Sequence, residues 1–375
     1  MTKIPREPAT THGDNAPNVS RATAAGTARY AKSSAPSFAA DFFRPFVSGL
    51  CVSSIGLGTY LGDCAAEDDD GYAGTAYQAL ASGINVLDTA INYRCQRSER
   101  TLGAALARAL KAHVVARDGV VVCTKGGYIP LDDTPPATRE DYQAYVQREY
   151  FATGLARAED VVAGGHCIAP SFLRAQIDRS RANLGLDTID VYYVHNPEQQ
   201  LDAITPDELA QRLRAAFEML EEQCAGGRIG AYGCATWNGL RVPPGTRGHL
   251  GLETLLAAAR DVAGQRHHFA VVQAPINLAC AEAVRAPTQP LGNHTVPLLQ
   301  AAADLGVGVV ASAALFQGKL TGDLPATVRE ALPGLATDAQ RAIAFVRSLP
   351  WVATALVGTR SLHHLDENLD AARRR

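Results

Sequence analysis

The sequence lacks the features that define several protein classes. Its strongly apolar stretches, such as residues 305–315, are shorter than the about 20 residues that a bilayer-spanning helix needs, so we predict no membrane helix and no membrane partner. Lys and Arg number 35 against 38 Asp and Glu, which gives a formal charge of -3. Such a chain lacks the basic excess of a nucleic-acid-binding surface, and we expect no nucleic-acid partner.

Cysteine is present, but not in the spacing of a redox or zinc motif. The eight cysteines include no CxxC pair, and most lie in apolar or glycine-rich surroundings. A chain with this much apolar sequence does not need a disulfide framework, so we interpret them as free thiols in a reducing compartment. They are Cys51, Cys64, Cys95, Cys123, Cys167, Cys224, Cys234 and Cys280.

Residues 1–40 lack a sustained apolar period and are rich in Ala, Thr, Ser, Pro and Asn. Such a composition buries too little apolar surface to offset the entropy of ordering, and we predict a mobile N-terminal arm. The arm also lacks the unbroken apolar segment of a secretory signal. We therefore expect a cytoplasmic protein.

What the sequence does contain is enough apolar residues for a large core. Hydrophobic residues make up 47% of the 375 positions and charged residues 19%, which is typical of a globular protein. Over residues 41–375, short β-branched runs alternate with amphipathic segments, the pattern of βαβ units and a parallel sheet. Eight such pairs predict an α/β fold, a (β/α)8 TIM barrel formed by one domain.

The predicted strands are short and apolar throughout, as expected where helices cover one face of the sheet and the barrel interior fills the other. They are residues 52–57, 84–87, 120–124, 189–194, 229–233, 270–273, 307–311 and 354–357. The helices follow them near residues 71–82, 97–111, 171–184, 206–225, 249–263, 295–304, 337–348 and 361–371.

A doubly wound open sheet is the main alternative, and it would need a GxGxxG turn between the first strand and its helix. Here "GLGTYLG" at 56–62 leads into an acidic segment at 67–70 before any helix, so this signal is weak. Two connections, 126–170 and 314–335, are longer than ordinary βα loops. Both leave the carboxyl end of a strand, and we predict that they are functional loops.

Polar side chains close several of the predicted strands, where barrel enzymes carry their catalytic residues. Taken singly, each is often only a polar cap at the surface. Together, an Asp, a Lys, a Tyr and a His on one rim form an acid–base set. The residues are Asp88, Lys125, His195 followed by Asn196, and Gln273 at the strand ends, and Tyr93 five positions beyond Asp88.

Such a set is suited to proton donation to a carbonyl oxygen. A free tyrosine has a pKa of about 10, too high for efficient acid–base catalysis at neutral pH. We expect Lys125 to lower the pKa of Tyr93, and Asp88 to keep that lysine charged and oriented. His195 would hydrogen-bond the substrate oxygen or relay the proton.

Seven segments in the same order make the chain resemble the aldo-keto reductases over about residues 42–371. They are "GLGTYLG" at 56–62, "GINVLDTAINY" at 83–93, "VVVCTKGG" at 120–127, "IDVYYVHNP" at 189–197, "GRIGAYGCATWN" at 227–238, "VVQAPIN" at 271–277 and "ALVGTRSLHHLDEN" at 355–368. The resemblance implies a catalytic tetrad of Asp88, Tyr93, Lys125 and His195, with Tyr93 as general acid and a nicotinamide cofactor as hydride donor.

The resemblance also implies where the cofactor binds. The segment after the eighth strand opens a helix whose N-terminal amides can bind a phosphate, and Arg360 suits the 2′-phosphate of NADPH, with NADH as the alternative. The expected cofactor-binding residues are Gly58, Thr59, Asn196, Thr236, Asn238, Gln273, Gly358, Thr359, Arg360, Ser361, His364, Glu367 and Asn368. The chain departs from the family at Ser312, where many members carry an aromatic residue that stacks on the nicotinamide; Phe316 follows in the loop.

The insertion at 126–170 has two interpretations. Its aromatic and histidine side chains are suited to line a substrate pocket, whereas "REDYQAYVQREYF" predicts an amphipathic helix that would decorate the flank of the barrel. Both remain open at this point. The side chains are Tyr128, Tyr142, Tyr145, Tyr150, Phe151 and His166.

The sequence therefore predicts an enzyme that interconverts a small-molecule carbonyl compound (an aldehyde, ketone, sugar or lactol) and an alcohol, without a metal. A low-turnover redox sensor on the same barrel is the alternative. A metal-dependent barrel hydrolase is disfavoured because only one strand end carries a histidine. The oligomeric state stays open.

Overall fold

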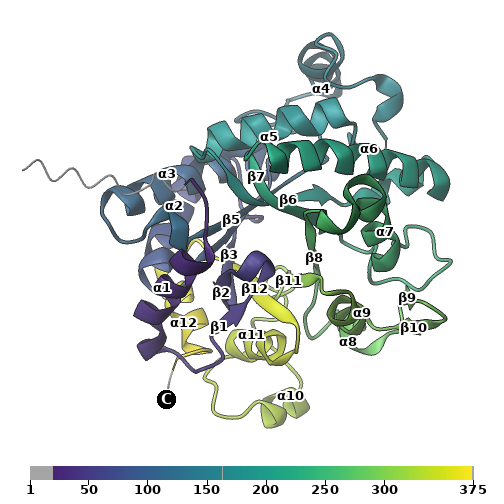
Figure 1. The fold of residues 1–375 in the computed structure, drawn as a ribbon. Helices are drawn as coiled ribbons and strands as arrows, with labels where there is room; N and C mark the ends of the chain where they lie inside the picture. The colour runs from purple at the N-terminus through teal and green to yellow at the C-terminus, as the bar shows by residue number, and fades with distance from the viewer. Residues whose placement is uncertain (1–19, 163, 374–375) are drawn as a thin grey trace, which may run out of the picture.

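Eight parallel strands form a closed barrel in the computed structural model, which describes residues 20–162 and 164–373 (Figure 1). The strand order around the barrel is β11-β12-β3-β4-β5-β6-β7-β8, which confirms the predicted (β/α)8 fold. The strands are β3 (Ile55–Gly58), β4 (Val86–Asp88), β5 (Val121–Gly126), β6 (Ile189–His195), β7 (Ile229–Ala235), β8 (Phe269–Pro275), β11 (Gly308–Ser312) and β12 (Val352–Gly358).

The helices that follow these strands surround the barrel. They are α2 (Ala66–Ala81), α3 (Arg97–Lys111), α5 (Pro170–Leu184), α6 (Pro206–Ala225), α7 (Leu252–Ala263), α9 (Leu298–Leu305), α11 (Asp338–Ser348) and α12 (Leu362–Asp370). The loops carry the shorter elements α8 (Glu282–Arg285), β9 (Gln289–Leu291), β10 (His294–Val296) and α10 (Ala326–Ala331). No helix in the described ranges has the length and apolarity to cross a bilayer.

Successive residues of strands β5 and β6 belong to two separate apolar clusters. Val121 and Val191 lie in the cluster that fills the barrel interior, whereas Val122 and Tyr192 pack in the larger cluster between sheet and helices. Because successive strand side chains point to opposite faces, both faces of these strands are buried. This double burial explains why the strands are apolar throughout.

The first predicted strand, 52–57, is divided in the structure. Its beginning belongs to β2 (Cys51–Ser53), which pairs antiparallel with β1 (Phe43–Pro45) outside the barrel, and only β3 enters the barrel. Val52 and Leu50 join the interior cluster of the barrel. The hairpin therefore closes one end of the barrel, and this position accounts for the apolar residues that precede β3.

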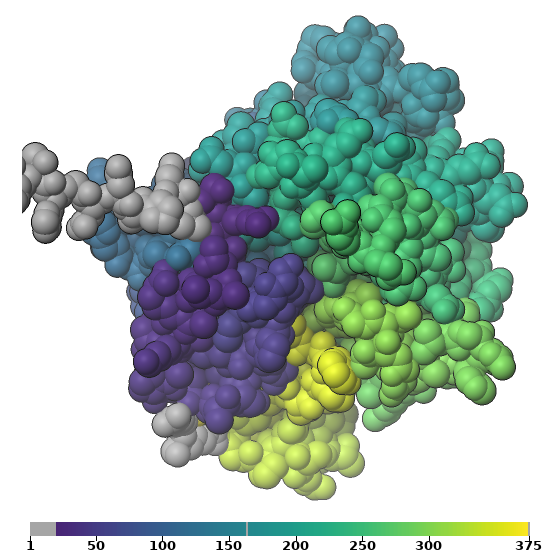
Figure 2. Space-filling model, viewed as in Figure 1, coloured from purple at the N-terminus to yellow at the C-terminus, as the bar shows by residue number. Residues whose placement is uncertain are grey.

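The prediction of a mobile arm is wrong for residues 20–40, and the rest of that arm lies outside the described residues. Helix α1 (Ala24–Ser34) packs on the barrel (Figures 1 and 2). The Ala22 amide donates to the Asp190 carboxylate at 2.6 Å, and the Tyr30 hydroxyl donates to the Leu80 carbonyl at 2.6 Å. Gly26 leaves no room for a Cβ against Asp118. Hydrogen bonds, the close approach at Gly26 and the burial of Phe38 in the core hold this segment, and a composition averaged over residues 1–40 did not reveal these contacts.

The insertion after β5 forms a helical projection on the flank of the barrel, at the top of Figure 1. It contains α4 (Arg139–Val146), which continues into a π-helical turn over Gln147–Phe151. The hydroxyls of Tyr145 and Tyr150 both donate to the Pro130 carbonyl, at 2.9 and 3.0 Å. These bonds tie the projection to the first residues of the insertion.

Candidate active site

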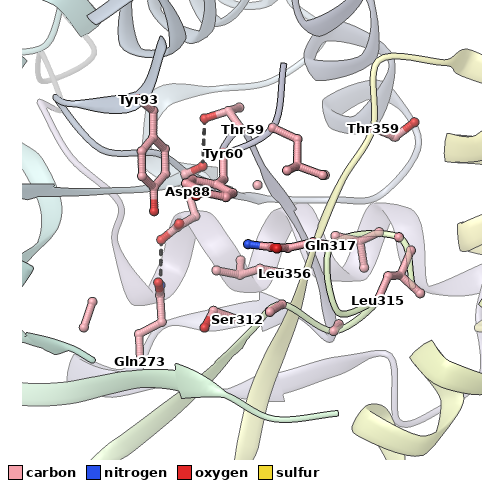
Figure 3. Close-up of a pocket in the computed structure, with 18 of the residues that line it drawn as sticks. Thr59, Tyr60, Asp88, Tyr93, Gln273, Ser312, Leu315, Gln317, Leu356 and Thr359 are labelled. Carbon is pink, nitrogen blue, oxygen red and sulfur yellow. Dashed lines mark hydrogen bonds between the residues drawn. The ribbon is translucent and has the colours of Figure 1, made fainter. Parts of the chain in front are cut away.

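A cavity of about 880 Å³ opens at the carboxyl ends of the barrel strands. Its walls are formed by strand ends and by the loops that follow them, including residues 312–318 after β11 (Figure 3). Asp88, Tyr93 and His195 line it, and the buried Lys125 lies directly behind them through its bond to Asp88. The structure thus brings the four predicted catalytic residues together.

Lys125 is fixed by two acceptors. Its ammonium lies 2.5 Å from Asp88 Oδ1 and donates to the Thr89 carbonyl at 2.7 Å. Asp88 Oδ2 in turn accepts from Gln273 Nε2 at 2.8 Å, as Figure 3 shows. Although burial lowers the pKa of Lys125, the Asp88 carboxylate and Tyr93 more than offset it, and the pKa stays above its ordinary value. The lysine therefore carries a positive charge at neutral pH.

Tyr93 lies against this lysine, with the Lys125 ammonium 5.0 Å from its ring centroid. Figure 3 shows its hydroxyl end directed at Asp88. Burial raises the pKa of Tyr93, and the opposing effect of Lys125 is smaller. The expectation that Lys125 lowers the pKa of Tyr93 below its ordinary value is therefore wrong for this structure. Burial destabilises the phenolate more than the neighbouring Lys125 ammonium stabilises it.

His195 completes the group as a neutral side chain. Its ring packs edge-on against Tyr93, with the centroids 5.8 Å apart. Burial, and after it the positive charge of Lys125, lowers its pKa well below the ordinary value. Its Nδ1 atom has no hydrogen-bond partner among the described residues. A neutral imidazole with a free ring nitrogen can hydrogen-bond a ligand oxygen without adding charge.

The backbone of His195 is braced by His166, a contact that the sequence did not reveal. His166 Nε2 lies 2.7 Å from the His195 carbonyl oxygen, and Gln200 Nε2 lies 2.8 Å from His166 Nδ1. Because the amide can only donate, Nδ1 accepts and Nε2–H donates to His195. Burial lowers the pKa of His166 to about 4, so this tautomer stays neutral at ordinary pH.

Ten of the thirteen predicted cofactor-binding residues line the cavity. They are Gly58, Thr59, Asn196, Thr236, Gln273, Gly358, Thr359, His364, Glu367 and Asn368. Thr236 Oγ1 is buried and has no hydrogen-bond partner in the described part of the chain. Because buried hydroxyls are almost always hydrogen-bonded, this atom suits a polar group of a ligand.

Asn238, one of the three that do not line the cavity, has a structural role. Its backbone amide donates to Glu198 Oε1 at 3.1 Å, and the amides of Trp237 and Gly239 donate to the same oxygen at 2.7 and 3.2 Å. Glu198 is buried two residues beyond Asn196. One carboxylate thus fixes the loop after β7, and with it the cavity residue Trp237.

Arg360 and Ser361 also lie outside the cavity lining. The Arg360 guanidinium forms an ion pair with Asp68 in the first turn of α2, and the Ser361 hydroxyl caps α12 by accepting from the His364 amide. No Lys or Arg is among the described residues that line the cavity. The assignment of Arg360 to the 2′-phosphate is therefore not supported by its position, because Asp68 competes for the same guanidinium.

Several cavity residues escaped the sequence analysis. Tyr60 and Trp237 are 54% and 39% exposed and form an aromatic rim, while Asn92 has a buried Oδ1 without a described hydrogen-bond partner. The loop after β11 contributes Gln317 and Thr321. This loop lies in the connection 314–335, whose length predicted a functional loop, although these two side chains were not singled out. Tyr60, Trp237 and Asn92 were missed because none of them is a polar residue at the end of a predicted strand, which was the position that the prediction relied on.

Ser312 lines the cavity at the end of β11, whereas Phe316 does not contribute to the described lining. The aromatic and histidine residues of the insertion divide in a similar way. Tyr128 lines the cavity, while the other five pack elsewhere; for example, the Tyr150 ring lies against Phe172, with the centroids 5.5 Å apart. The insertion is thus mostly a decoration of the flank that sends Tyr128 to the cavity and His166 behind it.

Comparison with known proteins identifies the family. The family model of the aldo/keto reductase family matches residues 54–242, half of the chain. The match contains the strand ends that carry Asp88, Lys125 and His195. The chain belongs to the aldo/keto reductase family.

Two curated relatives are sugar dehydrogenases by name. The chain is 31% identical to D-threo-aldose 1-dehydrogenase of a Pseudomonas species over 191 residues, which cover 50% of each protein. It is 25% identical to L-galactose dehydrogenase of Arabidopsis thaliana over 349 residues, or 86% of this chain and 85% of that one. The match to the Pseudomonas enzyme thus spans only half its length.

Solved structures share the fold. An aldo/keto reductase of Klebsiella pneumoniae, crystallised with NADP and acetate, superposes with a TM-score of 0.58 at 20% identity. The superposition covers 88% of this chain and 89% of the other. At this level of identity the likeness supports the barrel and not a particular substrate.

Proposed function

We propose that this protein uses NADPH to interconvert an aldose, or a related hydroxylated carbonyl compound, and its redox partner, with Tyr93 as the general acid and base. The observation that carries this proposal is the convergence of Tyr93, the charged pair Lys125–Asp88 and the neutral His195 on one cavity. The bound cofactor supplies or accepts the hydride at the reacting carbon.

Each of these side chains has a distinct task. In the direction of reduction, the Tyr93 hydroxyl donates its proton to the carbonyl oxygen, and its raised pKa keeps the phenol protonated beforehand. Lys125 stabilises the tyrosinate that remains, and Asp88 holds Lys125 in place. His195, which lines the cavity, hydrogen-bonds the same substrate oxygen. In oxidation, Tyr93 takes the proton back.

The cavity residues fit a nicotinamide dinucleotide. The unpartnered Thr236 hydroxyl and Gln273, whose Oε1 is not used in its bond to Asp88, suit the polar carboxamide. Gly358 and Thr359 lie before the N-terminus of α12, where backbone amides favour a phosphate. The neighbour that was crystallised with NADP favours NADPH, and the His364 imidazole, which lines the cavity at this end, can donate a hydrogen bond to a phosphate.

The substrate class is supported by the relatives and by the cavity. Both curated relatives are named as dehydrogenases of aldoses. The exposed faces of Tyr60 and Trp237 at the rim suit the apolar face of a sugar ring, and Asn92 with Tyr128 suits its hydroxyl groups. In the pyranose form, the C1 hydroxyl would lie where the Tyr93 phenolate accepts its proton.

A cofactor titration followed by a substrate panel tests this function. Quenching of protein fluorescence should report binding of NADPH and NADH, after which aldoses are tested for oxidation and short aldehydes for reduction. We expect the wild-type protein to turn over hydroxylated substrates. Tyr93→Phe should lose this turnover but still bind the cofactor. Tight, slowly exchanging cofactor without turnover of any substrate would favour the redox-sensor alternative.

A further inference from the structure

Tyr128 lies on the cavity wall beside the reacting group. It comes two residues after the end of β5, and its ring packs edge-on against His195 with the centroids 5.0 Å apart and the planes at 85°. Tyr93 contacts the same imidazole, and both tyrosines line the cavity. Tyr128 therefore lies next to the position of the reacting oxygen, whereas Tyr93 exchanges a proton with that oxygen.

The Tyr128 hydroxyl has a proton to donate. Asn196 Nδ2 donates to its oxygen at 2.8 Å, which occupies one acceptor site. In the described part of the chain, no acceptor receives the hydroxyl proton. Burial raises the pKa of Tyr128 to about 12, although the bond from Asn196 opposes it. The group is thus an O–H donor across the whole neutral range.

The direction of this donor is fixed by its surroundings. Gln176 accepts from the Gly127 amide at 2.9 Å and donates to the Tyr128 carbonyl at 2.6 Å. Gly127 has a φ of +148°, and a Cβ there would lie 2.8 Å from the His195 carbonyl oxygen. On its other side, the Tyr128 ring contacts His166 at 5.0 Å. The backbone and the ring of Tyr128 are therefore held in place before any substrate binds. A hydrogen-bond donor can distinguish between substrates only if its position is fixed in this way.

We propose that Tyr128 determines substrate specificity by donating a hydrogen bond to an oxygen on the atom next to the reacting carbon. This inference rests on the proposed function and deepens it. For an open-chain aldehyde that oxygen is the 2-hydroxyl, and for a pyranose it is the 2-hydroxyl as well. A substrate without it leaves the phenol proton of Tyr128 without a partner from the substrate, which costs the complex free energy. The site therefore prefers α-hydroxy carbonyl compounds over their deoxy analogues.

Three small aldehydes provide the test, because they differ only in the hydroxyl group. 2-Hydroxypropanal has it next to the carbonyl, 3-hydroxypropanal has it one carbon further, and propanal lacks it. The wild-type protein with NADPH should reduce 2-hydroxypropanal with a kcat/KM about tenfold above those of the other two, the factor expected of one hydrogen bond to a fixed donor. In Tyr128→Phe this preference should disappear, because kcat/KM for 2-hydroxypropanal falls to the level of the other two substrates in the same variant.

Tyr145→Phe is the matched control, since its hydroxyl is bonded to Pro130 and does not line the cavity; it should keep the wild-type preference. Equal losses of all three substrates in Tyr128→Phe would assign Tyr128 to packing against His195 and overturn the proposal. The wild-type preference needs no variant, so its absence would overturn the proposal even if Tyr128→Phe folds poorly. A wild-type protein that binds NADPH but turns over neither aldehydes nor aldoses would refute the proposed function itself.

Discussion

The polar side chains at the two ends of strand β6 differ in how completely they are hydrogen-bonded. Near its start, Asp190 accepts from the amides of Ala22 and Val122 and from the Arg117 guanidinium, at 2.6, 2.8 and 2.8 Å. At its end, His195 has a ring nitrogen without a described partner. Five residues separate a carboxylate whose bonds are complete from an imidazole whose bonds are not.

This difference extends beyond one strand. The amino end of the barrel is closed by the segment that carries Ala22, Leu50 and Val52, all of which join the interior cluster. At the carboxyl end, Thr236 Oγ1 and Asn92 Oδ1 lack described partners and face or border the cavity. Because an unmade buried hydrogen bond costs stability, the open end gives up stability for the ability to bind.

The largest expected effect is a loss of stability when Asp190, at the amino end of the barrel, is replaced. In Asp190→Ala the Arg117 side chain, 11% exposed, loses its carboxylate and two backbone amides lose their acceptor. We expect the free energy of unfolding to fall by about 3–5 kcal/mol, the usual cost of breaking a buried pair, as measured by denaturant titration.

A surface pair at the same end is the control for that measurement. Arg29 is 62% exposed and bonds to Asp118, so Arg29→Ala should cost at most about 1 kcal/mol. If Asp190→Ala lowered the free energy of unfolding by no more than Arg29→Ala does, the buried contacts of Asp190 would not stabilise the amino end of the barrel as we expect.

At the open end, His166 should make stability depend on pH. Its pKa of about 4 in the folded protein lies below the about 6.5 of an unfolded chain, so the unfolded state binds the extra proton between these values. Stability is thus complete above about pH 6.5 and falls as the pH drops toward 4, by about 3 kcal/mol for this group. Denaturation of wild type and His166→Gln at pH 7, 5 and 4 measures it.

The glutamine variant keeps an N–H donor for the His195 carbonyl but does not titrate. Its stability should therefore fall less than that of wild type over the same pH range, and other titrating groups cancel in the comparison. Parallel pH curves for the two proteins would show that His166 is not held neutral in the folded state.

Removing the acid at the open end should affect turnover but not stability. Tyr93→Phe should lower kcat by about 100-fold or more, which corresponds to about 2.7 kcal/mol, with little change in the dissociation constant of the cofactor. Stopped-flow turnover and fluorescence titration separate the two quantities. Lys125→Met should be similarly damaging. Near-wild-type kcat in Tyr93→Phe would require another acid.

The smallest effect is expected for Arg360, at the edge of the open end. Because its guanidinium is paired with Asp68 and is 47% exposed, Arg360→Ala should weaken NADPH and NADH by the same factor, less than about threefold. Isothermal titration calorimetry with both cofactors measures this. A loss confined to NADPH would show that Arg360 leaves Asp68 for the 2′-phosphate.

Most of the fold could be predicted because the barrel repeats one local pattern. Eight apolar strands buried on both faces, each followed by an amphipathic helix, leave few alternatives. The strand ends at Asp88, Lys125 and His195 could be found for the same reason, since a parallel barrel gathers all carboxyl ends on one rim. Segments outside the repeat were harder to assign. Residues 20–40 were predicted as a mobile arm but contain a packed helix, and the insertion 126–170 was left with two interpretations, of which the helical decoration agrees with the structure.

By itself, then, the sequence determined the barrel, its catalytic rim and the meeting of Tyr93 with Lys125, because these depend on position along regularly repeated strands. The tertiary structure decided what depends on contacts between distant segments. It showed Ala22, in the segment before α1, bound to Asp190, Arg360 paired with Asp68, and Tyr128 held between His166 and His195. A charge or ring has no fixed partner until the chain folds, and hydrogen bonding and burial then determine which group stays free for a ligand.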